Sequence, residues 1–232
     1  MSSLPPQSNA RCLAAVEAQL RQTIEQPNYP CVAAVQAMAR NDFTLGLYGE
    51  LGAGRCWANL RADLLRYLEA QQRSGSLYST LFAVFRPGPL DEPAFEAAMW
   101  RELSYLTSRE DRATDWPATS CSDPADPTFV FSLGGHSLFV VGIHPNSSRR
   151  GRRFPFTGLI FNAFAQFEAF ERKGSYERMV QLNRQRDIAF DGTVNPMVEQ
   201  HGDQWEAIQF SGQTNPPTWQ CPFRFLSQIQ KP

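Results

Sequence analysis

A histidine followed closely by four arginines is the most chemically suggestive stretch of this chain. Residues 142–154 read GIHPNSSRRGRRF, in which His144 precedes Arg149, Arg150, Arg152 and Arg153. One neutral imidazole beside several guanidinium groups suits a haem of the b type, because the imidazole binds iron and the arginines pair with two propionates. A solvated loop and a nucleic-acid-binding patch are the alternatives for the arginines.

The overall charge weakens the nucleic-acid alternative. Lys and Arg number 22 against 23 Asp and Glu, which gives a formal net charge of −1, whereas a nucleic-acid-binding protein is expected to carry a basic excess. No apolar stretch approaches the roughly 20 residues that a membrane-spanning helix needs. We therefore expect neither nucleic acid nor membrane as a partner. We also expect a single domain over residues 10–228 after a flexible tail of residues 1–9.

The cysteines and the other histidines offer further candidate ligands. Five scattered cysteines without a CxxC pair favour a reducing, cytoplasmic location over a disulfide framework. Cys31 and Cys221 each adjoin a proline, and a thiolate can bind haem iron, although a buried inert cysteine is the commoner case. His136 and His144 lie eight residues apart on one expected strand, a span of roughly 26 Å, so at most one of them can bind a given iron.

The hydrophobic pattern predicts helices first and strands in the middle of the chain. We expect helices at residues 10–26, 31–41 and in WANLRADLLRYLEA, a strand at 77–85, and a helix in DEPAFEAAMWRELSYL capped by Asp91. TFVFSL and HSLFVVGI flank two glycines and predict a hairpin, TGLIF (157–161) predicts a third strand, and residues 163–173 and 175–190 predict helices. This order of helices and strands along the chain favours an α+β fold with a central, mostly antiparallel sheet flanked by helices.

An ordered series of segments resembles one known family. The segments are FSLGGHSLFVVGIHPNSSRRGRRF, LIFNAFAQFEAFERKGSYERM, NRQRDIAFDGTVNPM, WEAIQFSGQ and WQCPF, preceded by YPCVAA, STLFAVF, FEAAMWRELSYL and SDPADPTFVFSL. Together they are similar to the YqcI/YcgG family over about residues 29–223. The order of the segments is more specific than any one of them.

The resemblance implies a haem-dependent enzyme, since characterised members of the family are N-oxygenases. They oxidise a nitrogen of arginine-like guanidino compounds or of an aminoimidazole in the biosynthesis of specialised metabolites. The implied cofactor is a non-covalent haem b. Dioxygen or peroxide would be the oxidant, a nitrogen-rich small molecule the substrate, and an electron donor a further partner.

By position, the resemblance implies that His144 is the iron ligand. The residues that it places around the cofactor are Arg149, Arg152, Arg153, Phe154, Asn162, Phe164 and Gln166. Two positions depart from the family pattern: Phe164 stands where many members carry histidine, and Gln213 stands where arginine is common.

A cationic substrate of this kind needs a carboxylate partner. We expect Glu206, which lies among aromatic residues in WEAIQF, and then Asp187, for which pairing with Arg186 is the alternative. A haem protein without oxygenase activity, such as a gas sensor or haem carrier, is the second hypothesis. A module that captures a phosphorylated or acidic partner is the third. The sequence leaves the oligomeric state open, with a homodimer as one alternative.

Overall fold

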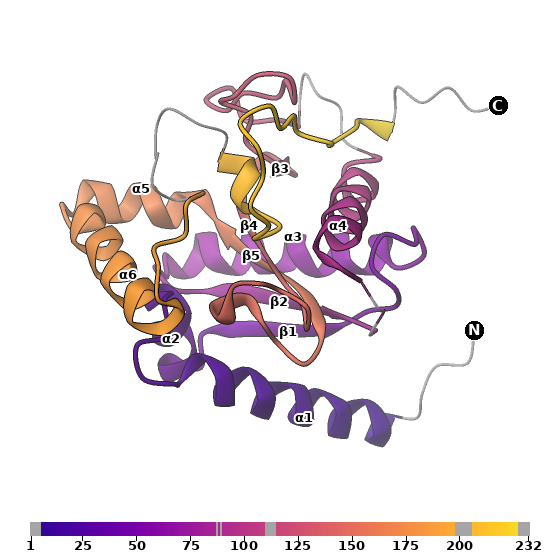
Figure 1. Ribbon diagram of the computed structural model, residues 1–232. Coiled ribbons are helices and arrows are strands. Elements are labelled where there is room, and N and C mark those ends of the chain that lie inside the picture. Colours follow the sequence, from indigo (N-terminus) through magenta and orange to yellow (C-terminus); the bar gives the residue numbers. More distant parts are fainter. Residues whose placement is uncertain (1–5, 87, 89, 110–114, 198–205, 227–232) are drawn as a thin grey trace.

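The computed structural model describes residues 6–86, 88, 90–109, 115–197 and 206–226. Its strands are β1 (Phe43–Leu47), β2 (Thr80–Phe85), β3 (Ser132–Leu133), β4 (His136–Ile143) and β5 (Thr157–Ala163). Its helices are α1 (Pro6–Ile24), α2 (Val32–Arg40), α3 (Trp57–Ser74), α4 (Glu92–Leu106), α5 (Phe164–Arg172) and α6 (Tyr176–Asp191), together with two short 3₁₀ helices, η1 (Arg150–Arg152) and η2 (Glu206–Gln209) (Figure 1).

The described strands form one sheet in the order β1-β2-β5-β4-β3. β1 runs parallel to β2, whereas the other neighbouring pairs are antiparallel. The predicted α+β class with a mostly antiparallel sheet is therefore confirmed. β3 and β4 form the expected hairpin, which turns at Gly134 and Gly135 with φ values of 56° and 77°, a backbone region that glycine adopts without strain.

Strand β1 is an element that the sequence analysis missed. Its residues, FTLGL, are few and include a glycine, so they show no clear strand pattern. The strand forms because α2 ends at Asn41 in the left-handed conformation, with a φ of 52°, and the chain turns directly along β2. The pairing of Leu45 with Phe82 is a long-range contact that no local pattern reveals.

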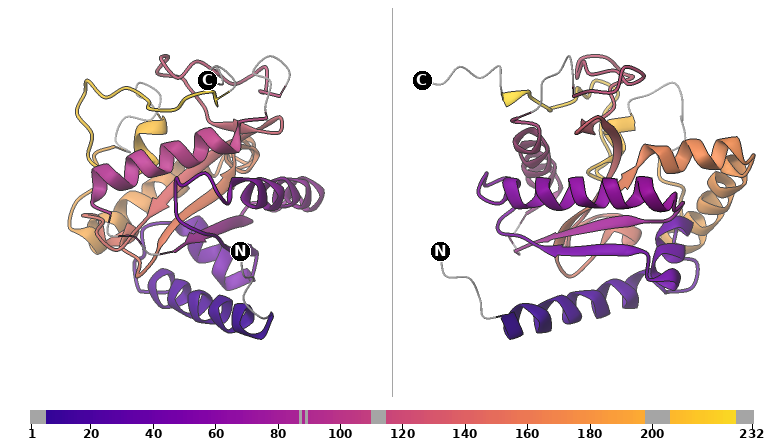
Figure 2. Two further views of the ribbon diagram at one scale, coloured as in Figure 1. Left: turned by 90° about the vertical axis from the view of Figure 1, so that its right-hand side faces the viewer. Right: turned by 180° about the vertical axis from the view of Figure 1, so that it is seen from behind.

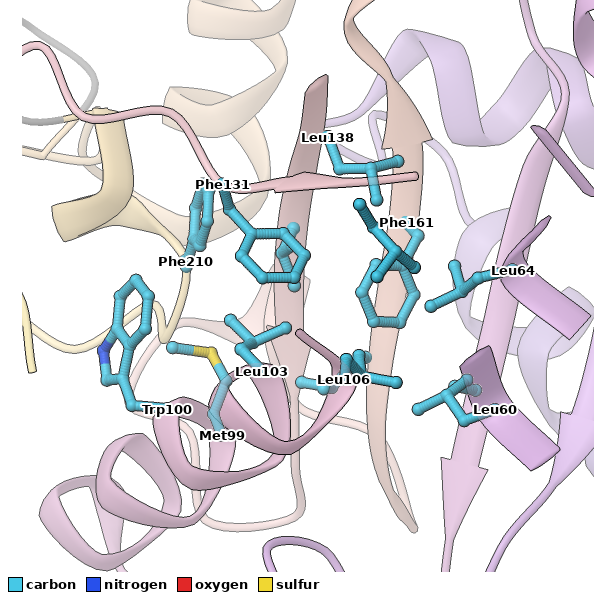
Figure 3. Packing of buried hydrophobic residues seen from close by; sticks show 14 of the residues in the cluster. Leu60, Leu64, Met99, Trp100, Leu103, Leu106, Phe131, Leu138, Phe161 and Phe210 are labelled. Carbon is cyan, nitrogen blue, oxygen red and sulfur yellow. The ribbon is translucent and has the colours of Figure 1, made fainter. Parts of the chain in front are cut away.

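Alternating side chains give the sheet two different faces. On one face, Leu138, Val140 and Phe161 belong to a large apolar cluster that α3 and α4 close (Figure 3). On the opposite face, Phe82 and Ile160 belong to a smaller cluster with residues of α1. Figure 2 shows α3 and α1 on opposite sides of the sheet.

Helix α4 illustrates how local signals position the packed face. The Asp91 carboxylate caps the helix by accepting a hydrogen bond from the backbone N–H of Ala94 at 2.9 Å, and a proline stands in the first turn. Its apolar residues Phe95, Met99, Leu103 and Leu106 form one stripe and are fully buried. Burial of this stripe against the sheet holds the helix in place.

Most other predicted elements are confirmed with shifted ends. α5 and α6 are separated at Gly174 as expected, and β2 begins at Thr80 instead of residue 77. α1 begins at Pro6, within the segment that we expected to be a tail. Within the described residues, no helix combines the length and the apolar character needed to cross a membrane.

Candidate functional site

A cavity of about 300 Å³ lies on the face of the sheet opposite α3 and α4. Its floor comes from alternate strand residues, including Phe139, Val141, Ile160 and Asn162, and its walls come from α2, α5, α6, η1 and η2. The size is at the lower end of the range for small-molecule sites, about 300–1,000 Å³. The second face of the sheet is thus closed by helices only in part, and the remaining space can hold a ligand.

The cavity combines an aromatic lining with many charged groups. The rings of Phe164 and Phe167 lie 5.7 Å apart, and Phe167 also contacts Phe139 at 5.8 Å in an edge-to-face arrangement. The charged side chains that line it are four carboxylates, Glu171, Asp187, Asp191 and Glu206, and three guanidinium groups, Arg149, Arg152 and Arg184. Such a lining suits a polar or ionic ligand with a flat apolar part.

Arg149 joins the connection between β4 and β5 to α6. Its Nη2 lies 2.7 Å from Oδ1 of Asp187 and 3.7 Å from Oδ2 of Asp191, and these side chains are at most 14% exposed. The same guanidinium donates hydrogen bonds to the hydroxyl and carbonyl oxygens of Thr193. Arg149 therefore fixes the C-terminal end of α6 as a wall of the cavity.

Arg152 joins the same connection to the C-terminal segment. Its Nη1 donates to the carbonyl oxygen of Phe210 at 2.9 Å and more weakly to that of Gly142 at 3.4 Å. Burial lowers the pKa of this guanidinium to about 10, so it still carries its charge at neutral pH. Arg152 lines the cavity beside Tyr29 and Cys31.

The other two arginines of this stretch lie outside the cavity. Arg153 donates hydrogen bonds to the carbonyl oxygens of Ser147 and Ser148. Arg150 donates to the carbonyl oxygen of Phe190 and packs its guanidinium 4.7 Å above that ring. The arginine-rich run is thus an anchor for loops and helix ends, and only Arg149 and Arg152 reach the cavity.

His144 lies on the other face of the sheet. The side chain is 1% exposed and stacks on Phe95 of α4, with ring centroids 4.3 Å apart. Both ring nitrogens are buried without a hydrogen-bond partner among the described residues, and burial lowers the pKa of the imidazole. His144 does not line the cavity, so our expectation that it and the arginines meet at one cofactor needs correction.

The remaining expected cofactor residues divide between the cavity and the core. Asn162, Phe164 and Gln166 line the cavity, and Gln166 is fixed by a hydrogen bond from Nε2 to the carbonyl oxygen of Ser79 at 2.7 Å. Phe154 is instead buried in the smaller apolar cluster. Its expected contact with a cofactor is therefore not present in this arrangement.

Both expected substrate carboxylates line the cavity. Asp187 is held by Arg149 and by the backbone N–H of Asn195, whose nitrogen lies 2.6 Å from Oδ2. This pairing replaces the alternative pairing with Arg186. Glu206 opens η2 near Tyr176, where burial and the charge of Glu206 raise the pKa of the tyrosine to about 12. Tyr176 is therefore a protonated phenol at neutral pH.

The two candidate cysteines differ in accessibility. Cys31 caps α2 and lines the cavity, where its sulfur accepts a hydrogen bond from the N–H of Ala34. Cys221 is buried in the large apolar cluster, and burial raises the pKa of its thiol to about 12. Cys221 therefore fits the inert, structural alternative.

Several cavity residues were missed by sequence reasoning. The largest group lies on α6, where the missed residues Asn183 and Asp191 share one face of the helix with the predicted Asp187, because the three recur every fourth position. This polar stripe could have revealed a helix that borders a site. Tyr29 had no such signal, because the turn that carries it meets Gly151 only in the tertiary structure, through a hydrogen bond of 2.9 Å.

The arrangement does not fit the haem site that we expected. The imidazole of His144 and the cavity lie on opposite faces of the sheet, Arg149 is already bound by two aspartates, and Arg153 points elsewhere. His136 does not line the cavity either, and His201 lies outside the described residues. Among the described residues, no group of three or more His, Cys, Asp or Glu side chains is placed to hold a metal ion.

Comparison with known proteins gives one match. The model of the YqcI/YcgG family matches residues 20–224, which includes every element from the last turns of α1 to the C-terminal segment. No curated protein and no solved structure matches the chain.

Proposed function

Because the chain belongs to the YqcI/YcgG family, we propose that it is a haem-dependent N-oxygenase that oxidises a nitrogen of a cationic, guanidino- or aminoimidazole-type small molecule. The resemblance supports the reaction class and the cofactor, which supplies oxygen-activating chemistry when bound. The cavity supports the substrate class. The expected haem residues are not gathered at one place, so we assign no reaction step to the cofactor.

The observation that carries the substrate assignment is that carboxylates and aromatic rings line the same cavity. A guanidinium or aminoimidazolium ion is flat, so its faces can stack on rings such as Phe164 and Phe167. Its N–H groups need an acceptor such as a carboxylate. A carboxylate in a water-poor cavity gives both affinity and orientation to such an ion.

Of the two expected carboxylates, we assign Glu206 to the substrate. Asp187 accepts hydrogen bonds from Arg149 and from the backbone of Asn195 and so holds the C-terminal part of α6 in place. Glu206 lies in the cavity wall near the N-terminal end of α6, with the neutral phenol of Tyr176 close by.

The reaction needs an oxidant that the protein alone does not provide. With dioxygen, one oxygen atom converts a substrate N–H to N–OH, and the other leaves as water after taking up two electrons from a donor and two protons. With hydrogen peroxide, the same hydroxylation yields water without a donor. We place this chemistry in the cytoplasm, in agreement with the five free cysteines.

The test measures ligand binding and turnover in haemin-loaded protein. We expect L-arginine or 2-aminoimidazole to bind by calorimetry and to yield an N-hydroxylated product with reductant and oxygen. Glu206→Gln should weaken binding by about tenfold or more and leave the haem absorption band unchanged. Glu168→Gln, on an exposed part of α5 outside the cavity, is the matched control and should bind as the parent does.

Three outcomes separate the hypotheses. Product formation that depends on Glu206 supports the N-oxygenase. A haem absorption band without product from any guanidino or aminoimidazole compound would instead favour a gas sensor or haem carrier. A protein that takes up no haemin would exclude both.

A further inference from the structure

Arg152 differs in its partners from Arg149, which lines the same cavity. The two cavity carboxylates near it, Asp187 and Asp191, are bound by Arg149. Arg152 forms no ion pair with a carboxylate in the described part of the chain, and its hydrogen bonds there use only Nη1. The Nε and Nη2 donors of a cavity-lining guanidinium are thus left for a ligand.

The surroundings of Arg152 are unfavourable for a cation unless an anion joins it. Burial lowers the pKa of the guanidinium, which means that the protein environment disfavours its charge. The first turn of α2 also borders this end of the cavity through Ala33 and Ala34, and the N-terminus of a helix has a positive potential. A bound carboxylate would be stabilised by both features and would accept two parallel hydrogen bonds from the guanidinium.

The opposite end of the cavity has the opposite preference. Tyr176, near Glu206, begins α6, whereas Asp187, near Arg152, lies eleven residues later. At 1.5 Å per residue these two positions are about 16 Å apart along the helix. The cavity therefore has a carboxylate of the protein near one end of α6 and an unpaired guanidinium near the other.

We propose that Arg152 is a carboxylate-binding residue and that the cavity takes a bipolar ligand, with its carboxylate at Arg152 and its nitrogen-rich cation towards Glu206. The assignment of the ligand's cationic end depends on the proposed function. The assignment of its carboxylate end depends on Arg152 alone. A free amino acid that carries a guanidino group has this chemistry. A propionate of a bound haem offers the same carboxylate, and the experiment distinguishes the two sources.

The experiment compares matched probes with and without a carboxylate. Calorimetry of haemin-loaded protein with L-arginine and agmatine, which differ by one carboxylate, tests the substrate. Uptake by haem-free protein of haemin and of its dimethyl ester tests the cofactor. The variants are Arg152→Met, Arg152→Lys and the control Arg153→Met, which lies outside this cavity.

We expect the parent protein to bind L-arginine at least about 10-fold more tightly than agmatine, because agmatine lacks the carboxylate that would accept charge-assisted hydrogen bonds from Arg152. Arg152→Met should bind the two compounds equally. Arg152→Lys should keep part of the preference, and Arg153→Met should keep all of it. If the protein instead prefers haemin over its ester through Arg152 and shows no preference for arginine over agmatine, the bound carboxylate belongs to the cofactor. The carboxylate-binding site at Arg152 is still supported in that case.

Absence of a carboxylate preference in both pairs would overturn the inference. If neither pair shows a preference, but arginine and agmatine bind equally and their binding depends on Glu206, the inference fails while the proposed function stands. The two failures are therefore distinguishable. Modification of the parent protein with phenylglyoxal covers the case in which Arg152→Met does not fold. Peptide mapping should show Arg152 protected by L-arginine or haemin but not by the matched probe, and equal reactivity with both would contradict the subsite.

Discussion

The two faces of the sheet are built from the same strands but closed in different ways. Towards α3 and α4, side chains such as Leu103, Leu138 and Phe161 are fully buried in one apolar cluster (Figure 3). Towards α5 and α6, residues such as Phe139 and Asn162 border a cavity instead. The packed face supplies stability, and the open face supplies a place for chemistry.

The difference comes from the helices that cover each face. α4 presents an apolar stripe that excludes water, whereas among the residues of α6 only Phe190 is buried. Ion pairs and hydrogen bonds hold α6, in particular those of Arg149 with Asp187 and Asp191. Because α6 is held by polar contacts at its end and not by an apolar stripe, the space between it and the sheet remains a cavity.

The largest effect is expected on the packed face. Leu103→Ala removes a fully buried side chain of α4 and should lower the free energy of unfolding by about 2–5 kcal/mol, because it leaves a void in close-packed surroundings. Val141→Ala, at the cavity, should cost less than about 1.5 kcal/mol. Urea titrations measure both, and equal losses would contradict the distinction between the faces.

The ion pairs of α6 give the next largest effect. Arg149→Met leaves two partly buried carboxylates without their cation, and we expect a loss of about 2 kcal/mol. Arg172→Met, which breaks an exposed pair with Glu168 on α5, should cost less than about 0.5 kcal/mol. Asp187→Asn in the Arg149→Met background should recover part of the loss, which a double-mutant cycle would detect.

The packed face also contains a carboxylate whose removal should stabilise the protein. Glu102 of α4 is 1% exposed, and burial raises its pKa, although its Oε2 accepts a hydrogen bond from the N–H of Gly52. The folded state therefore holds the proton of Glu102 more tightly than the unfolded state does. The contribution of Glu102 to the free energy of unfolding is therefore most favourable below the ordinary glutamate pKa. It becomes less favourable as the pH rises through the pKa of Glu102 in the folded state.

Glu102→Gln should accordingly raise the midpoint of thermal unfolding at neutral pH. The gain should shrink as the pH approaches about 4, where both states of the parent carry the proton. Melting curves of the two proteins across this range provide the test. A gain that does not depend on pH would show that ionisation of Glu102 is not the cause.

The smallest effect is expected for His144→Leu. The imidazole is buried against Phe95 with both nitrogens unpartnered among the described residues, and a side chain of similar volume should change stability by less than about 1.5 kcal/mol. The absorption band of haemin-loaded protein should also stay unchanged, because His144 does not line the cavity. Loss of that band would show that a bound cofactor reaches the packed face after all.

Local patterns were sufficient for most of the fold. The Asp91 cap of α4, the glycine hairpin before β4 and the break at Gly174 each depend on residues close in sequence, and each was predicted correctly. β1 was missed because its stability comes from pairing with β2, which the sequence separates by α3. The family was likewise evident from the order of short segments and is confirmed over residues 20–224.

Part of the composition of the candidate site could be predicted, but its arrangement could not. Glu206, Asp187, Arg149 and Arg152 were named from the sequence, and all four line one cavity. His144 and Arg149 are five residues apart in the chain, yet one stacks on α4 and the other pairs with α6. The reason is physical: where β4 ends, the direction of each side chain is set by the turn and by the partners that tertiary packing brings to it, and neighbours in sequence can face opposite sides of the sheet.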